Sequence, residues 1–182
     1  MTVDNTGLEL RYDYLEQFDH YEDDQMKKMS RLYSGKIGKV IISFNELESV
    51  LESCISFLIN NRTDSLGMQV IEYLDFSEKI SLGIKLIASN IGIMGEVEYK
   101  VPLQTLRKEF VRLSEIRNLV AHAKWASLDK KSFVRTTLKV ETSTGDVKFK
   151  AYKITPDILI KINKDINRLR DDFETFLEAL DL

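Results

Sequence analysis

Residues Lys36–Ile59 have the sequence KIGKVIISFNELESVLESCISFLI, and this stretch decides the fold class. Its apolar side chains recur at steps of three and four residues: Ile37, Val40, Ile41, Phe44, Leu47, Leu51, Ile55 and Leu58. Such spacing places them along one side of an α-helix as a buried stripe. The polar run Asn60–Ser65 is typical of a loop. The sequence therefore predicts a long amphipathic helix that packs against further helices.

Three more helices are predicted on the C-terminal side of this stretch. They cover about Ser77–Ser89, about Pro102–Trp125, and a segment from Pro156 to near the C-terminus. Thr155 followed by Pro156 is typical of an N-cap and a proline in the first helical turn.

Residues 133–154 have a different pattern. Apolar and polar side chains alternate over Phe133–Val140 and again over Val147–Ala151, with the polar stretch Thr142–Asp146 between them. Alternation with a period of two predicts two β-strands, and the polar stretch predicts a five-residue hairpin loop. The expected fold class is mainly α, a bundle of four to five helices with a small β-hairpin inserted before the last helix.

Residues 1–35 are acidic and include five aromatic side chains, so we expect an N-terminal arm or helix, helical from about Tyr12 to Tyr33. Residues 36–182 are expected to form the helical domain, with the hairpin at about 133–154. A chain of 182 residues suits a single core. No stretch is apolar enough to span a membrane, the N-terminus lacks a signal-peptide pattern, and Cys54 is the only cysteine. These features predict a cytoplasmic protein.

The sequence predicts no metal and no cofactor. Only His20, His122 and Cys54 offer nitrogen or sulfur ligands, and no zinc, di-iron or phosphate-loop spacing is present. A hard-cation site made of carboxylates alone stays open. Charge is uneven: the net charge is −3, but eight acids against one arginine make residues 1–24 −7, and thirteen Lys/Arg against five Asp/Glu make residues 100–153 +8. Solvated faces and a basic surface for a polyanion both fit this distribution.

The helix predicted over Pro102–Trp125 carries an arginine within its apolar stripe. At about 100° per residue, the stripe consists of Leu106, Phe110, Leu113 and Val120. Arg117 falls in the middle of it and needs a partner, because burying a lone charge is unfavourable. A carboxylate of the first helix, such as Glu48 or Glu52, is one candidate partner, and a bound phosphate is the other.

Asn118 and His122 lie four residues apart on one flank of the same helix, so their side chains are able to meet. His122 is about 140° round and about 7.5 Å along the axis from Arg117. A phosphate shared by both groups would therefore fit more easily between two such helices. The alternative role of His122 is that of a cation at a helix C-terminus.

The order Arg117-Asn118-x-x-x-His122, near the end of the third bundle helix, resembles the active-site signature of the HEPN (higher eukaryotes and prokaryotes nucleotide-binding) family of RNase type. The likeness covers about Lys36–Leu180, and the acidic arm and the hairpin are additions. The resemblance implies a metal-independent endoribonuclease that works as a homodimer and cleaves RNA by attack of the RNA's own 2′-hydroxyl. The resemblance implies that His122 transfers protons, that Arg117 binds the phosphate, and that Asn118 orients the imidazole or the phosphate.

The same resemblance implies a toxin or abortive-infection role in defence, with a cognate antitoxin as an expected partner. A toxin subgroup carries a tyrosine two residues after the histidine, where this chain has Lys124, so regulation through that tyrosine is not expected. Lys124 would add a phosphate contact. Trp125 either stacks on a base or anchors the helix end.

Strand alternation puts Arg135, Thr137 and Lys139 on one side of the first strand and Lys148 and Lys150 on one side of the second, so their charges are expected to gather on one face of the hairpin. This basic face is expected to guide RNA to the site. The expected RNA-binding residues are Lys124, Arg135, Lys139, Lys148 and Lys150. The alternative to an enzyme is a non-catalytic helical module for dimerisation or for nucleotide or RNA binding, in which Arg117 and His122 have structural roles.

Overall fold

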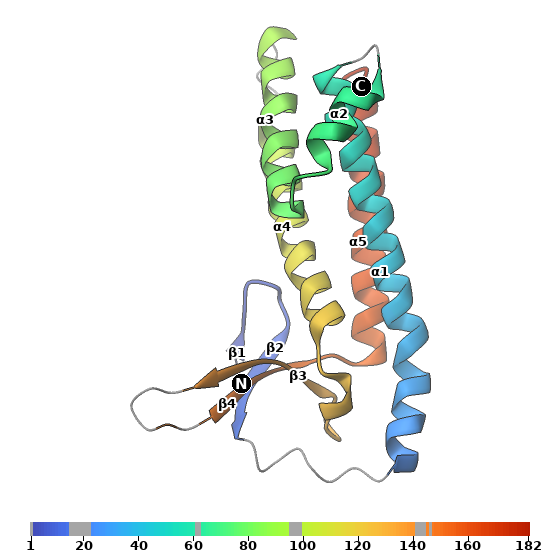
Figure 1. Ribbon diagram of the computed structural model, residues 1–182, viewed down its shortest axis with the longest axis vertical. Helices are drawn as coiled ribbons and strands as arrows, with labels where there is room; N and C mark the ends of the chain where they lie inside the picture. Colours follow the sequence, from blue (N-terminus) through green and yellow to red (C-terminus); the bar gives the residue numbers. More distant parts are fainter. Residues whose placement is uncertain (1, 15–22, 61–62, 95–99, 141–144, 146) are drawn as a thin grey trace. The chain divides into compact units, whose positions relative to one another are not determined.

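The computed structural model describes residues 2–14, 23–60, 63–94, 100–140, 145 and 147–182 (Figure 1). The elements in chain order are β1 (Thr2–Val3), β2 (Glu9–Tyr14), α1 (Asp23–Ile59), α2 (Asp64–Ile71), α3 (Phe76–Met94), α4 (Lys100–His122), the 3-10 helix η2 (Trp125–Ser127), β3 (Phe133–Val140), β4 (Val147–Lys153) and α5 (Pro156–Glu178). The described residues are thus mainly helical with a small antiparallel sheet. They fall into two compact units, Met1–Ile41 with Glu115–Asn163, and Ile42–Ser114 with Lys164–Leu182.

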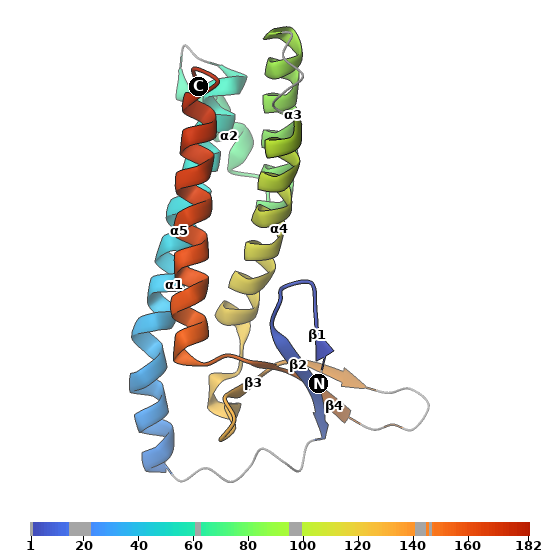
Figure 2. The ribbon, with the colours of Figure 1, turned by 180° about the vertical axis from the view of Figure 1, so that it is seen from behind.

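The first unit contains the sheet, whose strands lie side by side in the order β1-β2-β4-β3 (Figures 1 and 2). The predicted hairpin is confirmed, since β3 and β4 pair in antiparallel fashion from Phe133 opposite Lys153 to Val140 opposite Val147. Its expected loop, Thr142–Asp146, lies outside the described residues except for Gly145. The sheet has a buried centre that includes Phe133, Val134, Ala151 and Tyr152.

The helix expected over about Tyr12–Tyr33 is wrong in its first residues and confirmed over residues 23–33, which belong to α1. Residues Glu9–Tyr14 form β2, which pairs with β4 from Leu10 opposite Tyr152 to Tyr14 opposite Lys148. Leu10, Tyr12 and Tyr14 alternate with charged residues, and this period-two pattern suits a strand that has a partner. The acidic N-terminal segment is therefore part of the same sheet as the basic hairpin.

The second unit is helical. A row of aromatic rings forms part of its core. The ring centroids of Phe44 in α1 and Phe76 in α3 are 4.8 Å apart. The ring centroid of Phe110 in α4 lies 6.4 Å from that of Phe76 and 5.1 Å from that of Phe173 in α5. The segments of α1 and α5 in this unit lie side by side in both ribbon views, and Arg170 of α5 pairs with Glu46 of α1 at 2.8 Å (Figures 1 and 2).

A buried lysine connects α1 and α3 within the second unit. Lys79 is 9% exposed and binds Glu48 at 2.7 Å and Glu52 at 2.5 Å, the two carboxylates that were candidate partners of Arg117. Burial lowers the pKa of Lys79, but the hydrogen bonds and charges of the two carboxylates outweigh it, so the pKa lies above its usual value. These carboxylates thus have a structural role in the second unit.

The remaining helix predictions agree in type and differ at the ends. The helix α1 ends at Ile59 as expected, α3 continues past Ser89 to Met94, and α4 ends at His122 rather than at Trp125. Thr155 caps α5 as predicted, since its hydroxyl accepts from the N–H of Ile158 at 3.2 Å. The short helix α2 was not expected. None of the helices in the described ranges combines the length and apolar character that a membrane crossing needs.

Candidate functional site

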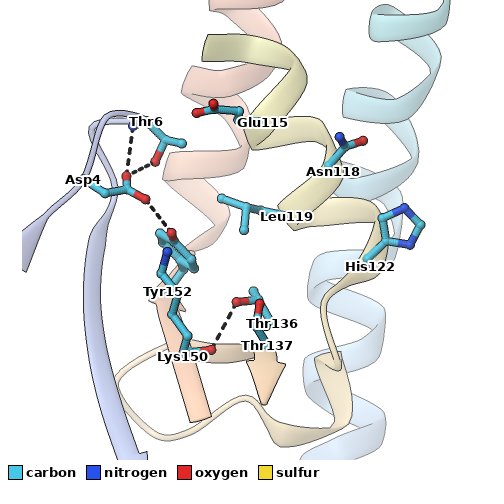
Figure 3. Close-up of a pocket in the computed structure, with 10 residues that line it drawn as sticks. All are labelled: Asp4, Thr6, Glu115, Asn118, Leu119, His122, Thr136, Thr137, Lys150 and Tyr152. Atoms are coloured by element: carbon cyan, nitrogen blue, oxygen red, sulfur yellow. Dashed lines mark hydrogen bonds between the residues drawn. The ribbon is translucent and has the colours of Figure 1, made fainter. Parts of the chain in front are cut away.

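The C-terminal part of α4 forms one wall of a cavity of about 430 Å³ in the first unit (Figure 3). This wall consists of Glu115, Asn118, Leu119 and His122, whose spacing of three, four and seven residues places them on one side of the helix. The other walls come from the turn after β1 and from two strands: Asp4, Thr6, Thr136, Thr137, Lys150 and Tyr152. The cavity therefore combines segments from both ends of the unit's sequence.

The structure brings two of the three motif residues to this cavity. Asn118 and His122 are exposed and line it, whereas Arg117 is half-buried and is not part of the lining. Arg117 is connected to the site through Asn118, because its Nη1 donates a hydrogen bond to Asn118 Oδ1 at 3.0 Å. The expected position of Arg117 on the apolar side of α4 agrees with its burial, since its Nε is buried, and Ile116, 1% exposed, extends the apolar stripe on one flank.

The wall opposite α4 is organised around Asp4. Its carboxylate accepts a hydrogen bond from the N–H of Thr6 at 2.9 Å and further bonds from the hydroxyls of Thr6 and Tyr152. Lys150 places its Nζ 4.9 Å from the centroid of the Tyr152 ring. In Figure 3, Leu119 lies between this group and the pair Asn118 and His122, which project from the other flank of α4.

Two pKa values in this wall depart from the usual ones. Burial raises the pKa of Asp4, but hydrogen bonds from Thr6 and Tyr152 and the charge of Lys150 outweigh it, and the pKa lies below its usual value. Burial raises the pKa of Tyr152, and the hydrogen bond to Asp4, with the nearby negative charges that include Glu115, raises it further. At neutral pH the wall therefore presents an ionised Asp4 that is bound to a neutral phenol.

The expectation that the polar hairpin residues share one face of the sheet is confirmed for Thr137, Lys148 and Lys150 and is wrong for Arg135. Thr137 pairs with Lys150, so Thr137, Lys148 and Lys150 share the sheet face that borders the cavity. A β-bulge between Arg135 and Thr137 reverses the alternation, and Arg135 pairs with Ala151 on the other face. Its guanidinium lies 4.3 Å from the centroid of the Phe149 ring there.

The two other lysines that were expected to bind RNA are Lys139 and Lys124, and backbone hydrogen bonding fixes the position of each. Lys139 pairs with Lys148 in the register, and the Lys139 side chain lies outside the described part of the chain. Lys124 has an exposed side chain, and its N–H donates to the carbonyl of Arg135 at 2.8 Å, which joins the end of α4 to β3. Trp125 acts as the anchor: its Nε1 donates to the carbonyl of Val120 at 3.0 Å, and its ring lies 5.4 Å from that of Tyr33.

The acidic and basic ends of the charge distribution meet in the sheet. Glu9 of β2 pairs with Lys153 of β4 at 2.9 Å, and Arg11 pairs with Asp129, just before β3. The guanidinium of Arg11 also lies 4.1 Å from the centroid of the Phe133 ring. Within residues 100–153, the charge of Lys153 is therefore balanced by the N-terminal segment, whereas the pair with Arg11 neutralises an acid, Asp129.

Several wall residues were missed by the sequence reasoning. Glu115 was detectable, because it precedes Asn118 and His122 by three and seven residues on the same helix. Asp4 and Tyr152 carried no such signal, since their bond depends on strands that are distant in sequence. Nowhere in the described residues do three or more His, Cys, Asp or Glu side chains gather as they would around a metal ion.

No family model matches the sequence, and neither a curated protein nor a solved structure gives a significant match.

Proposed function

We propose that the protein is an endoribonuclease of the HEPN type, which cleaves RNA without a metal ion at a site formed by two copies of the chain. The observation that carries this proposal is the shared cavity of Asn118, His122 and Lys150, with Arg117 bound to Asn118. The cavity supplies an imidazole for proton transfer, an amide for orientation and one cation, Lys150, and Arg117 adds a second cation beside the cavity, next to Asn118. The exposure of Asn118 and His122 leaves them accessible to RNA and to a second protomer.

In the proposed reaction, His122 accepts the proton of the 2′-hydroxyl, and the 2′-oxygen attacks the phosphorus atom. The bond from phosphorus to the 5′-oxygen breaks, and this oxygen takes a proton from His122 of the partner subunit. The products are a 2′,3′-cyclic phosphate and a 5′-hydroxyl. Arg117 and Lys150 stabilise the negative charge that develops on the phosphate oxygens. A toxin or defence role, with an antitoxin as partner, accompanies this proposal.

Two alanine variants separate catalysis from structure. His122→Ala is expected to reduce RNA cleavage by roughly 100-fold or more and to leave the melting temperature unchanged, because the side chain is exposed. Arg117→Ala is expected to reduce cleavage and also to lower the melting temperature, because this side chain is half-buried. The matched control is Lys108→Ala, exposed on α4 and outside the cavity lining, which should keep full activity.

The assay uses end-labelled RNA in the presence of EDTA, with detection of 2′,3′-cyclic phosphate ends. A substrate with 2′-deoxyribose at the cleavage site should resist. Wild-type protein that cleaves no RNA, or a His122→Ala variant with full activity, contradicts the proposal. The composite site also requires a homodimer, so light scattering should give twice the chain mass of 21.1 kDa. A monomer at micromolar concentration would count against a shared site.

One observation favours a second candidate, a module that binds a nucleotide or RNA without cleaving it. The cavity contains a single imidazole, and most of its other polar groups are hydroxyls, an amide and carboxylates. Such groups suit hydrogen bonding to a nucleotide but supply only one half of a general acid–base pair. Saturable RNA binding with no product, under conditions where the homodimer is present, would favour this candidate.

A further inference from the structure

Glu115 is a carboxylate of the cavity wall that has no hydrogen-bond or ion-pair partner among the described residues. The other acid of the wall, Asp4, already accepts bonds from Thr6 and Tyr152. Glu115 is exposed and points toward Thr6 across the cavity (Figure 3). Both of its oxygens are therefore available to accept hydrogen bonds from a ligand in the cavity.

The position of Glu115 relative to His122 suits one nucleotide. Seven residues of helix separate them by about 10.5 Å along α4, which is comparable to the length of a nucleotide from its phosphate to the far edge of its base. Leu119, four residues after Glu115 and three before His122, also lines the cavity and offers an apolar surface to a base plane. A phosphate near Asn118 and His122 would thus place the edge of its base near Glu115.

We infer that the cavity binds a guanine of the RNA, with the Glu115 carboxylate accepting hydrogen bonds from guanine N1–H and N2–H; this inference rests on the proposed function. Guanine is the base that presents two adjacent donors on its Watson–Crick edge. Adenine and cytosine present a donor beside an acceptor, and uracil presents one donor between two acceptors. A carboxylate with two free oxygens accepts only, so it pairs in bidentate fashion with guanine and repels the acceptors of the other bases.

The first test measures cleavage of four oligonucleotides that each contain one ribonucleotide, G, A, C or U, in a DNA strand. Wild-type protein should favour the ribo-G substrate over the ribo-A substrate by roughly 10- to 100-fold in kcat/KM, the usual discrimination from one bidentate contact. Glu115→Gln replaces one acceptor by a donor and should abolish or reverse this preference. The control Glu174→Gln, an exposed glutamate of α5, should keep it.

The second test titrates wild-type protein with 3′-GMP and with 3′-AMP by calorimetry. Cleavage of all four oligonucleotides at equal rates, with equal affinity for the two nucleotides, overturns the guanine inference and leaves the proposed nuclease intact. Tighter binding of 3′-GMP that Glu115→Gln abolishes, with no cleavage of any RNA, supports the inference and refutes the nuclease. Absence of both cleavage and nucleotide binding refutes both. A Glu115→Gln variant that melts at the wild-type temperature and keeps the guanine preference also overturns the inference.

Discussion

Tyr152→Phe removes one hydroxyl from the wall of the cavity and nothing else. Tyr152 is 2% exposed, and its hydroxyl donates to Asp4, which also accepts from Thr6. A phenylalanine keeps the ring and its packing, so the variant isolates the bond that ties the turn after β1 to β4. If this bond stabilises the first unit as the structure indicates, the free energy of unfolding should fall.

The size of the effect follows from the charge and burial of Asp4. A hydrogen bond to a charged group contributes about 1.5–3 kcal/mol. Asp4 is only half-buried, so water is able to replace part of the lost donor, and we expect the lower end, about 1.5 kcal/mol. For a chain of this length, that loss lowers the melting temperature by about 3–6 °C. Tyr73→Phe, at an 85% exposed tyrosine, is the matched control and should change neither quantity.

The pH dependence identifies the acceptor. Because the pKa of Asp4 in the folded protein lies below its usual value of 3.8, its ionised form contributes stability above that value, and the contribution is lost as pH falls through the folded pKa. Tyr152→Phe weakens this contribution. The difference in the free energy of urea unfolding between wild type and Tyr152→Phe should therefore be largest at pH 7 and should become smaller below about pH 4. A difference under about 0.5 kcal/mol at pH 7, or one that persists unchanged at pH 3, refutes Asp4 as the acceptor.

Three further predictions concern packing, charge and the sheet face. Gly67→Ala should lower the free energy of unfolding by about 3 kcal/mol, because its Cβ would lie 2.4 Å from the backbone of α1. The control Gly35→Ala has open space around its Cβ and should raise that free energy by about 0.5–1 kcal/mol, so equal urea midpoints for the two variants would contradict the packing of α2. Lys79→Met should cost about 2–3 kcal/mol by leaving two carboxylates without their cation, and unchanged thermal unfolding would contradict this role. Lys148→Gln should reduce the slope of log RNA affinity against log salt concentration by roughly 0.7. Arg135→Gln, on the other face of the sheet, should leave this slope unchanged, and equal slopes for the two variants would contradict the different faces that the bulge gives these residues.

The helices and the hairpin were predictable because each carries its own local pattern. The helix α5 begins at Pro156 after a threonine cap, and β3 and β4 alternate on either side of one short loop. By contrast, β2 owes its structure to β4, where Leu10 pairs with Tyr152 far along the chain. The acidic composition of the N-terminal residues favoured an arm or a helix, and a short strand with a distant partner leaves only a weak local signal.

The candidate site divides in the same way. Asn118 and His122 were predictable as neighbours, because a spacing of four residues brings side chains together on any helix. The bulge between Arg135 and Thr137 was not, since one extra residue leaves the sequence alternation intact and changes only the pairing. The strand face that borders the cavity was therefore predicted correctly for Lys150 and wrongly for Arg135.

The charge distribution acquires a different meaning once the sheet is known. Glu9 of the acidic segment neutralises Lys153 of the basic segment, and the charge of Lys150 acts on Asp4, whereas Arg11 and Asp129 pair the cation of the acidic segment with an acid of the basic one. Charges that balance one another at short range contribute little at distances beyond a Debye length of about 8–10 Å. For the proposed ribonuclease, Lys150 and Lys153 should therefore contribute less to long-range attraction of RNA than their charges alone predict. If the protein is the ribonuclease that we propose, contacts inside the cavity should dominate its recognition of RNA, and we expect its base preference to be stronger than the salt dependence of its affinity.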